Sequence, residues 1–432
     1  MKHSPNNPIL LSSSLRVDQA REAIADLVNA LLIESPLESE IVSLNDALNR
    51  VLSEDLLSPI DVPSADNSAM DGYAFDGNCL KLDSPTIQLK VVGIAYAGQP
   101  YVGEIATGEC IQIMTGALMP NACDTVIPQE FVTASDREIV FDPSLLKSGD
   151  NRRLKGEDLQ KNKPAILAGR ILRPADLGLA ASLGIASLKV QRKLRVAILS
   201  SGDEVTPLGQ TLQEGGIYDS NRYSLTGMLK RLGLEVIDCG IVQDDPDSLK
   251  AAFCAAAVKA DVLISSGGVS VGEADFTKQV LQELGDVGFW KIAMRPGRPM
   301  AFGTLKPVSG KSPAHKTLFF GLPGNPVAVM VTFYQFVRSA LLQLNGAKDT
   351  TPLLTQAITE QAIRKKAGRT EFQRAILGRD PEGRPSVRLT GSQGAGILRS
   401  MSEANCFVIL AHDQENIAAG DWVDIALFEG LL

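Results

Sequence analysis

Residues 261–275 have the sequence Asp261-Val-Leu-Ile-Ser-Ser-Gly-Gly-Val-Ser-Val-Gly-Glu-Ala-Asp275, and this stretch decides the fold. Its run at 262–264 is short and wholly apolar, which is typical of a strand buried on both faces. The serines and glycines at 265–268 allow a sharp turn, because glycine adopts backbone conformations that other residues avoid. The apolar spacing from Phe276 onward then predicts a helix, with Gly285 as its C-cap. A strand, a glycine turn and a helix in this order predict a ligand site at the strand's carboxyl end.

Apolar strands and helical patterns alternate over residues 193–346. Further strands are expected at 194–200, 234–242, 289–294 and 318–320. Such alternation predicts βαβ units and a parallel sheet with right-handed crossovers. The loops at the carboxyl ends of these strands would share one edge of the sheet. They carry Asp203, Glu204, Asp244, Glu273, Asp275, Lys291, Arg295 and Arg298.

These charged residues predict a site for a hard metal ion and a phosphate-bearing ligand. Paired carboxylates without histidine or cysteine suit Mg²⁺, and Asn325-Pro326 predicts a helix start that exposes backbone N–H groups to an anion. Each residue also has a simpler interpretation as a cap or a surface charge. An isolated Asp275 would be an N-cap, and we assign Asp245, which precedes Pro246, to capping outright.

The regions on either side of residues 193–346 show other sequence patterns. Apolar residues at helical spacing predict a helix from Val17, a second helix is expected at 45–56, and Pro174 opens a third that ends at Gly184. Short β-rich runs between turns predict a β insertion and a C-terminal β barrel. The expected parts are a disordered tail (1–14), a discontinuous helical domain (15–58 and 159–192), an inserted β domain (59–158), an α/β domain (193–346) and a β barrel (347–432).

Composition excludes several classes of function. The net charge of −8 argues against nucleic-acid binding, which needs a basic surface. The six cysteines form no Cys-x-x-Cys pair and the histidines number three, so neither a disulfide framework nor a zinc site is indicated. The N-terminal residues lack the features of a signal peptide, and the longest apolar run is far shorter than a membrane span. We therefore expect a cytoplasmic protein without membrane contact.

Five motifs together resemble the molybdopterin molybdenumtransferase family (the MoeA and gephyrin E-domain family), which includes the C-terminal domain of gephyrin. The resemblance runs from about residue 15 to the end of the chain. The motifs are Asp66-Asn-Ser-Ala-Met-Asp-Gly-Tyr-Ala74, Ile113-Met-Thr-Gly-Ala117, Ser201-Gly-Asp-Glu204, Ser265-Ser-Gly-Gly-Val-Ser-Val-Gly-Glu-Ala-Asp275 and Gly321-Leu-Pro-Gly-Asn-Pro326.

The resemblance implies a cytosolic homodimer that uses Mg²⁺ to insert molybdenum from molybdate into adenylylated molybdopterin, releasing AMP. It further implies contacts with an upstream adenylyltransferase and with recipient molybdoenzymes. The resemblance also implies that the helical domain (15–58 and 159–192) mediates dimerisation and that the α/β domain (193–346) is a catalytic domain of molybdopterin-binding type. By motif position, the catalytic or metal-directing residues would be Asp71, Thr115, Glu204, Asp244 and Asp275, of which Glu204, Asp244 and Asp275 would hold the metal. Phosphate and molybdate would be bound by Gly267, Gly268, Ser270, Lys291, Arg295, Arg298, Pro323, Gly324, Asn325, Pro326 and Arg374.

The chain departs from the family pattern at two places. Arg295 and Arg298 stand where the family often has lysines, which keeps the charge but changes its geometry. Ala395 replaces a frequent serine, so that hydroxyl contact is lost. The rival enzyme is the related molybdopterin adenylyltransferase, but its glycine turn typically reads Gly-Gly-Thr-Gly, unlike residues 267–270, and it lacks the β insertion. A scaffold role, as gephyrin's domain has at synapses, is the alternative from another class.

Overall fold

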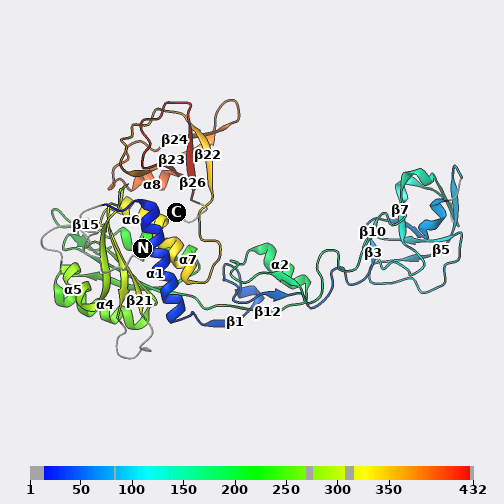
Figure 1. Ribbon diagram of the computed structural model, residues 1–432, viewed down its shortest axis with the longest axis horizontal. Coiled ribbons are helices and arrows are strands. Elements are labelled where there is room, and N and C mark those ends of the chain that lie inside the picture. Colours follow the sequence, from blue (N-terminus) through cyan, green and yellow to red (C-terminus); the bar gives the residue numbers. More distant parts are fainter. Residues whose placement is uncertain (1–13, 82–83, 136, 269–275, 307–315, 429–432) are drawn as a thin grey trace, which may run out of the picture. The chain divides into compact units, whose positions relative to one another are not determined.

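The structure is a computed structural model that describes residues 14–81, 84–135, 137–268, 276–306 and 316–428. The chain forms two compact units. Unit 1 comprises Met1–Ser53, Gly169–Pro174 and Ser187–Leu432, and unit 2 comprises Glu54–Ala168 and Ala175–Ala186. Unit 2 is therefore inserted into the sequence of unit 1, as Figure 1 shows by its colours.

A six-stranded sheet with the order β16-β13-β17-β21-β20-β18 is the centre of unit 1. Its first four strands are parallel: β16 (Glu235–Val242), β13 (Arg195–Ser201), β17 (Val262–Ser266) and β21 (Thr317–Leu322). The sheet is completed by β20 (Pro299–Leu305), antiparallel to β21, and by β18 (Gly285–Lys291), antiparallel to β20. Because β18 thus runs in the direction of β21, its carboxyl end lies at the same edge as those of the parallel strands.

Helices cover both faces of this sheet, because its strands are apolar on both sides. Val262 and Ile264 pack with α3 (Asn221–Arg231), α6 (Pro326–Thr332) and α7 (Arg338–Leu344). Leu263 faces the other way, toward α4 (Pro246–Lys259) and α5 (Phe276–Leu284). The N-terminal helix α1 (Val17–Glu34) lies beside α7 (Figure 1), and the Gln343 side chain donates to the Asn29 side chain at 2.7 Å.

One continuous helical stretch, Pro326–Leu344, is long and apolar enough to cross a membrane by length and composition. However, 78% of its most apolar window is buried inside the protein, as expected for a core helix. Between α6 and α7 it loosens into a π-helical turn, Phe333–Val337. There Arg21 of α1 donates to both the backbone oxygen and the side-chain oxygen of Gln335. This contact joins the first helix of the chain to the core helix.

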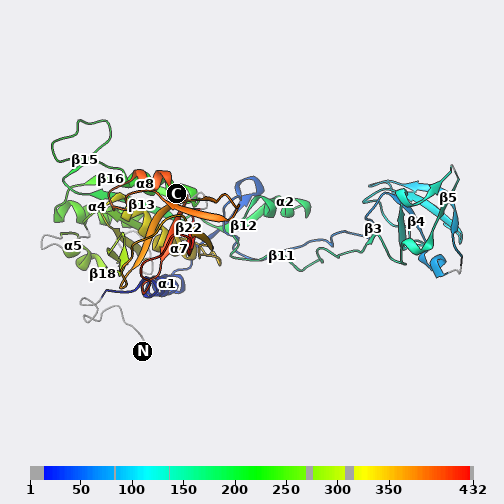
Figure 2. The same ribbon diagram turned by 90° about the horizontal axis from the view of Figure 1, so that it is seen from above.

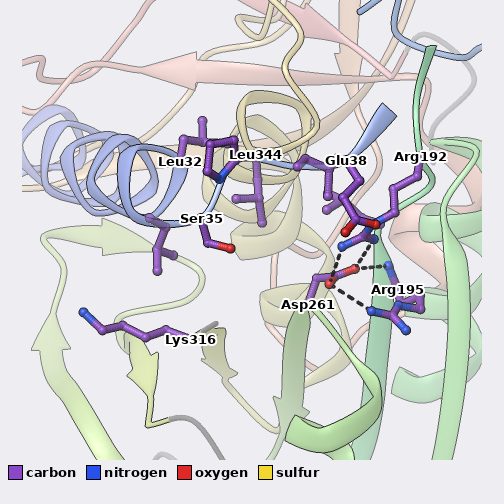
Figure 3. A pocket seen from close by; sticks show the side chains of 12 residues that line it. Leu32, Ser35, Glu38, Arg192, Arg195, Asp261, Lys316 and Leu344 are labelled. Carbon is purple, nitrogen blue, oxygen red and sulfur yellow. Dashed lines mark hydrogen bonds and ion pairs between the residues drawn. The ribbon is translucent and has the colours of Figure 1, made fainter. Parts of the chain in front are cut away.

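A buried ion-pair cluster lies at the edge of the sheet where the parallel strands begin (Figure 3). Arg192 donates two hydrogen bonds to Asp261, at 2.8 and 2.9 Å, and the backbone N–H of Arg195 donates a third at 2.8 Å. Burial alone would raise the pKa of Asp261, but these hydrogen bonds and the two guanidinium charges hold it below its usual value. The cluster lines a cavity of about 220 Å³ beside the end of α1.

The C-terminal part of unit 1 is a closed five-stranded barrel. Its strands close in the order β23, β24, β22, β26, β25 and back to β23, and a short strand, β19 (Met294–Arg295), adds to β23. The barrel bounds are β22 (Leu354–Thr359), β23 (Thr370–Arg379), β24 (Pro385–Leu389), β25 (Cys406–Leu410) and β26 (Trp422–Leu427), with α8 (Arg399–Glu403) before β25. The expectation of a small C-terminal barrel is confirmed.

Unit 2 is built on a six-stranded sheet with the order β7-β4-β6-β5-β9-β8. Figure 2 labels two of its strands, β4 and β5. Two apolar clusters pack on its strands. The bounds of these strands are β4 (Gly72–Phe75), β5 (Ile87–Ala95), β6 (Glu109–Ile113), β7 (Thr125–Pro128), β8 (Thr133–Ala134) and β9 (Glu138–Phe141). Two short strand pairs lie outside this sheet: β3 (Asn67–Ser68) pairs with β10 (Arg152–Arg153), and β2 (Leu56–Leu57) pairs with β11 (Pro164–Ile166). Helix α2 spans Pro174–Ser182. The predicted β insertion is confirmed.

Three local expectations were wrong. No helix forms at 45–56: after β1 (Ser39–Ser43), which pairs with β12 (Ser187–Gln191), a 3₁₀ turn, Leu44–Asp46, leads to Asn49 at φ 62° and to isolated β bridges at Val51 and Leu52. Gly285 is no helix cap but the first residue of β18, where any side chain would collide with the backbone of β20. The sheet is mixed rather than parallel throughout, because β20 runs against its neighbours.

Candidate active site

A cavity of about 950 Å³ lies in unit 1 where the parallel strands end. Its lining comes from the loops after β13, β16, β17 and β21, from the turn at 294–299 and from the barrel loop around residues 393–398. The cavity therefore lies where an open parallel sheet binds its ligands. Because the barrel supplies part of one wall, the sheet and the barrel together enclose the cavity.

The cavity brings together ten of the sequence-predicted residues, namely Glu204, Asp244, Gly267, Gly268, Arg295, Arg298, Pro323, Gly324, Asn325 and Pro326. Lys291 and Arg374 are not among its lining residues. Asp71 and Thr115 belong to unit 2. Ser270, Glu273 and Asp275 lie outside the described residues.

Two predicted metal ligands, Glu204 and Asp244, lie on this cavity. Burial raises the pKa of Asp244, and the negative charges of Asp203, Glu204 and Asp245 raise it further. Asp245 itself caps α4, since its carboxylate accepts from Ser248 N–H at 2.9 Å, which confirms its assignment to capping. In the described part of the chain, no three His, Cys, Asp or Glu side chains are grouped closely enough to hold a metal.

Cationic residues enter the same cavity from the turn that follows β18. Arg295 and Arg298 are both exposed, on either side of Gly297, which has φ 95°. The backbone oxygen of Arg298 accepts from Ile292 N–H at 2.8 Å, which closes the turn. A carboxylate-lined and guanidinium-lined cavity of this kind fits an anionic ligand that also carries a divalent cation.

The Arg374 side chain is buried, at 1% exposure, between β23 and the loop that leads to α8. Its Nε donates to Ser400 Oγ at 3.0 Å and its Nη2 to the backbone oxygen of Gly394 at 3.0 Å. Its own backbone N–H donates to the side chain of Gln393 at 2.8 Å. Burial lowers the pKa of Arg374 to about 10, and the charge of Arg295 contributes. Arg374 thus holds the loop that forms the barrel's side of the cavity.

The helix start at Asn325-Pro326 has the predicted form. Asn325 is the N-cap and Pro326 the first helical residue, although the Asn325 side chain makes no capping bond. The N–H of Val327 donates to the backbone oxygen of Ala395 at 3.1 Å, so the barrel loop takes one donor of the first turn. The remaining positive end of the helix dipole faces the cavity.

Sequence reasoning missed the Asp219–Asn221 segment, which also lines the cavity. Asp219 is buried and accepts from Ser200 Oγ at 3.0 Å and from Arg222 Nε at 2.9 Å. Asn221 Nδ2 donates to Ser266 Oγ at 2.8 Å and to the backbone oxygen of Gly324 at 2.7 Å, which ties two cavity loops together. The available signal was the polar run directly before α3, which is equally typical of an ordinary N-cap.

In unit 2, the structure joins Asp71 to Thr115. One carboxylate oxygen of Asp71 accepts from both the backbone N–H and the hydroxyl of Thr115, each at 2.7 Å. These two hydrogen bonds lower the pKa of Asp71. The two motifs that carry these residues, far apart in sequence, therefore form one exposed site in their own unit.

Three family models match consecutive stretches of the chain. They describe the MoeA N-terminal region (domain I and II) at residues 15–184, a probable molybdopterin binding domain at 197–343 and the MoeA C-terminal region (domain IV) at 356–428. A Haemophilus influenzae protein named molybdopterin molybdenumtransferase is 41% identical over 419 residues, which is 97% of this chain and all of that protein. A Nostoc protein of the same name is 34% identical, covering 97% of this chain and 96% of its own length.

The fold is similar to that of solved proteins with related names. The crystal structure of the molybdopterin biosynthesis moeA protein from Pyrococcus horikoshii OT3 superposes with a TM-score of 0.79 at 27% identity. The match covers 96% of this chain and 100% of that one. A second structure from the same species has a TM-score of 0.72 at 30% identity, with the same coverage.

Proposed function

Because the chain belongs to the molybdopterin molybdenumtransferase (MoeA) family, we propose that it inserts molybdenum from molybdate into adenylylated molybdopterin and releases AMP. The observation that carries this proposal is the composition of the cavity. Carboxylates, guanidinium groups and a helix start line one space in unit 1. The proposed reaction brings two anions together, a phosphoanhydride and molybdate, so it needs neutralised charge and fixed positions.

The carboxylates fit a Mg²⁺ ion. Burial raises the pKa of Asp244, and the negative charges of Asp203 and Glu204 raise it further, so a bound cation would offset an unfavourable concentration of negative charge. We propose Glu204, Asp244 and Asp275 as its ligands, Asp275 on the sequence motif alone. Bound there, Mg²⁺ would withdraw charge from the phosphoanhydride.

The cationic residues are proposed to bind the anions. Arg295 and Arg298 are exposed and lie on the cavity, where their fork geometry suits tetrahedral oxyanions. Arg374 would act by holding the Gln393 side chain and the Gly394 backbone, and by adding positive charge near Arg295. Further proposed substrate contacts, from motif position, are Gly267, Gly268, Ser270, Lys291, Pro323, Gly324, Asn325 and Pro326.

Asp71 and Thr115 are proposed as catalytic residues from motif position. The hydrogen bonds from Thr115 lower the pKa of Asp71, which extends its ionised form to more acidic pH, and fix the direction of its carboxylate. An ionised, oriented carboxylate can accept a proton or a hydrogen bond from the reacting group.

Turnover is the test of the whole proposal. Purified protein is incubated with adenylylated molybdopterin, molybdate and Mg²⁺, and both AMP and molybdenum cofactor are measured. AMP release that depends on molybdate supports the proposal. A parallel reaction with molybdopterin and ATP tests the adenylyltransferase alternative. Product in that reaction alone, or in neither reaction, contradicts the proposal.

We also propose that the protein is a cytoplasmic homodimer that contacts the upstream adenylyltransferase and the recipient molybdoenzymes. The family resemblance supports this proposal. Mass determination in solution tests it: a mass near twice the 46.1 kDa of one chain is expected, and a mass of one chain at micromolar concentration contradicts it.

A further inference from the structure

Two buried hydroxyl groups beside the glycine turn have no hydrogen-bond partner among the residues that the structure describes. Ser201, at 4% exposure, is the last residue of β13 and lies on the large cavity. Thr277, at 0% exposure, lies in the first turn of α5. Neither hydroxyl oxygen bonds to any residue in the part of the chain that the structure describes.

Both hydroxyls border Gly268. A Cβ atom built on Gly268 would lie 2.3 Å from Thr277 Oγ1 and 3.0 Å from Ser201 Oγ. A Cβ atom on Gly267 would lie 3.3 Å from Ser201 Oγ. Both glycines have positive φ, 92° and 65°. A side chain at Gly268 would therefore collide with both hydroxyl groups, which crowd the turn where it meets the cavity.

An unpartnered buried hydroxyl is unfavourable, because its desolvation is not offset by a hydrogen bond. Two such hydroxyl groups at one turn need a physical explanation, and a bound ligand that accepts hydrogen bonds from them provides it. A serine and a threonine hydroxyl can both donate. The positive end of the α5 dipole adds to these donors. Two donors and a positive dipole end match an anionic oxygen.

We propose that Ser201 and Thr277 are ligand-binding residues whose hydroxyls donate to a phosphoryl oxygen of the substrate beside the Gly267–Gly268 turn. The inference rests on the proposed function, which supplies a phosphorylated substrate, and it names the groups that bind the phosphoryl oxygen. It also makes these residues a site where stability has been exchanged for binding. Without ligand, each hydroxyl destabilises the fold.

Ser201→Ala and Thr277→Val test this inference, since each removes one hydroxyl and keeps the size similar. The probes are AMP and inorganic pyrophosphate, with affinity measured by calorimetry. We expect each variant to bind at least one probe about tenfold more weakly, as a hydrogen bond to a charged oxygen gives. We also expect each ligand-free variant to melt at the wild-type temperature or above it.

Ser265→Ala is the matched control. Ser265 is buried at 0% exposure and its hydroxyl is likewise without a partner among the described residues. Neither Ser265 nor Thr277 lines the cavity, but Ser265, unlike Thr277, is not among the atoms nearest to a Cβ built on Gly267 or Gly268. Its variant should show the same melting behaviour and unchanged affinity for both probes.

Lower melting temperatures of Ser201→Ala and Thr277→Val with unchanged probe affinity would overturn the inference, because the hydroxyls would then be structural. So would a wild-type protein that binds neither probe. The turnover assay separates the two proposals. Active wild-type protein with unchanged affinity in both variants refutes the inference alone, whereas weakened binding in the variants of an inactive wild-type protein refutes the proposed function alone.

Discussion

The carboxylate of Asp71 accepts two hydrogen bonds from Thr115, one from the backbone N–H and one from the hydroxyl, both at 2.7 Å. The two residues are exposed and 44 positions apart in sequence. Because a carboxylate that accepts several hydrogen bonds is harder to protonate, the pair lowers the pKa of Asp71. The threonine therefore sets the direction of the aspartate and extends its charged form to more acidic pH.

Replacing Thr115 with valine should raise the pKa of Asp71 toward its ordinary value. The backbone hydrogen bond remains and the hydroxyl bond is lost. If Asp71 acts as an anion, the acid limb of turnover moves to higher pH. Carbon NMR of the Asp71 carboxyl measures the pKa, and Thr115→Ser is the control that keeps the hydroxyl. An unchanged pKa in Thr115→Val would show that the hydroxyl bond contributes nothing.

Arg374→Lys should weaken the barrel loop while the barrel still folds. A lysine ammonium cannot span both Ser400 and the backbone oxygen of Gly394 as the planar guanidinium does. We expect a loss of about 1–3 kcal/mol in the free energy of unfolding, since a buried acceptor loses its donor. Molybdate affinity should fall as well. Arg379→Lys, at the exposed end of the same strand, is the control. Wild-type stability in Arg374→Lys would refute the anchoring role.

Asp261→Asn should destabilise unit 1 at neutral pH by about 3 kcal/mol, because Arg192 would lose its buried partner. The pKa of Asp261 is lowered in the folded protein, so its carboxylate contributes fully above the ordinary aspartate pKa of about 3.9. That contribution is lost as pH falls from there through the folded value.

Urea unfolding of the wild type and the variant at a series of pH values checks this expectation. The difference between the two proteins should be large at pH 7 and shrink below about pH 4. Asp424→Asn, an exposed position on β26, should show little difference at any pH. A difference in the free energy of unfolding between wild type and Asp261→Asn that increases as the pH falls would contradict the predicted pH dependence.

Asp244→Asn should weaken Mg²⁺ binding, whereas Asp245→Asn should not. The two residues are neighbours, but Asp244 lines the cavity and Asp245 caps α4, where asparagine is an equally good cap. Calorimetry with Mg²⁺ measures affinity without reference to activity. Equal Mg²⁺ affinity in the two variants would remove Asp244 from the proposed ligands.

Chelation of the wild-type protein should abolish turnover and leave circular dichroism unchanged, with recovery when Mg²⁺ is added. Circular dichroism should persist because the described fold is held by apolar clusters rather than by metal ligands. Turnover in metal-free buffer, or unfolding on chelation, would contradict the expected role of the ion.

The parallel part of the sheet and its edge could be predicted from the sequence, because the apolar runs at 194–200 and 262–264 have no other stable place than between two helical layers. β20 could not, since Pro299 at its start and Gly303 within it are typical of turns. The pairing of β20 depends on the strands on either side of it, β18 and β21. The prediction of a helix at 45–56 was wrong for a similar reason, because Val51 and Leu52 form β bridges with the distant residues Ile171 and Val190.

The candidate site was predictable where motifs and strand ends coincide, as at Glu204 and Arg295. Arg374 was assigned to substrate binding by motif position, but its guanidinium is buried against Ser400 and Gly394, which no local pattern connects to it. Ser201 shows the same limit. A serine at a strand end is ordinary, and its missing partner becomes visible only in three dimensions.

The contact between Arg21 and Gln335 has a consequence for synthesis of the chain on the ribosome. Its two residues are separated by 314 positions. At about 5–20 residues per second, α1 leaves the ribosome roughly 15–60 seconds before its partner helix exists. Until then the apolar face of α1, with Val17, Ile24 and Val28, lacks the core helix that it packs beside in the folded protein. Unit 2, whose sequence lies wholly between the two residues, can therefore fold before unit 1 is complete.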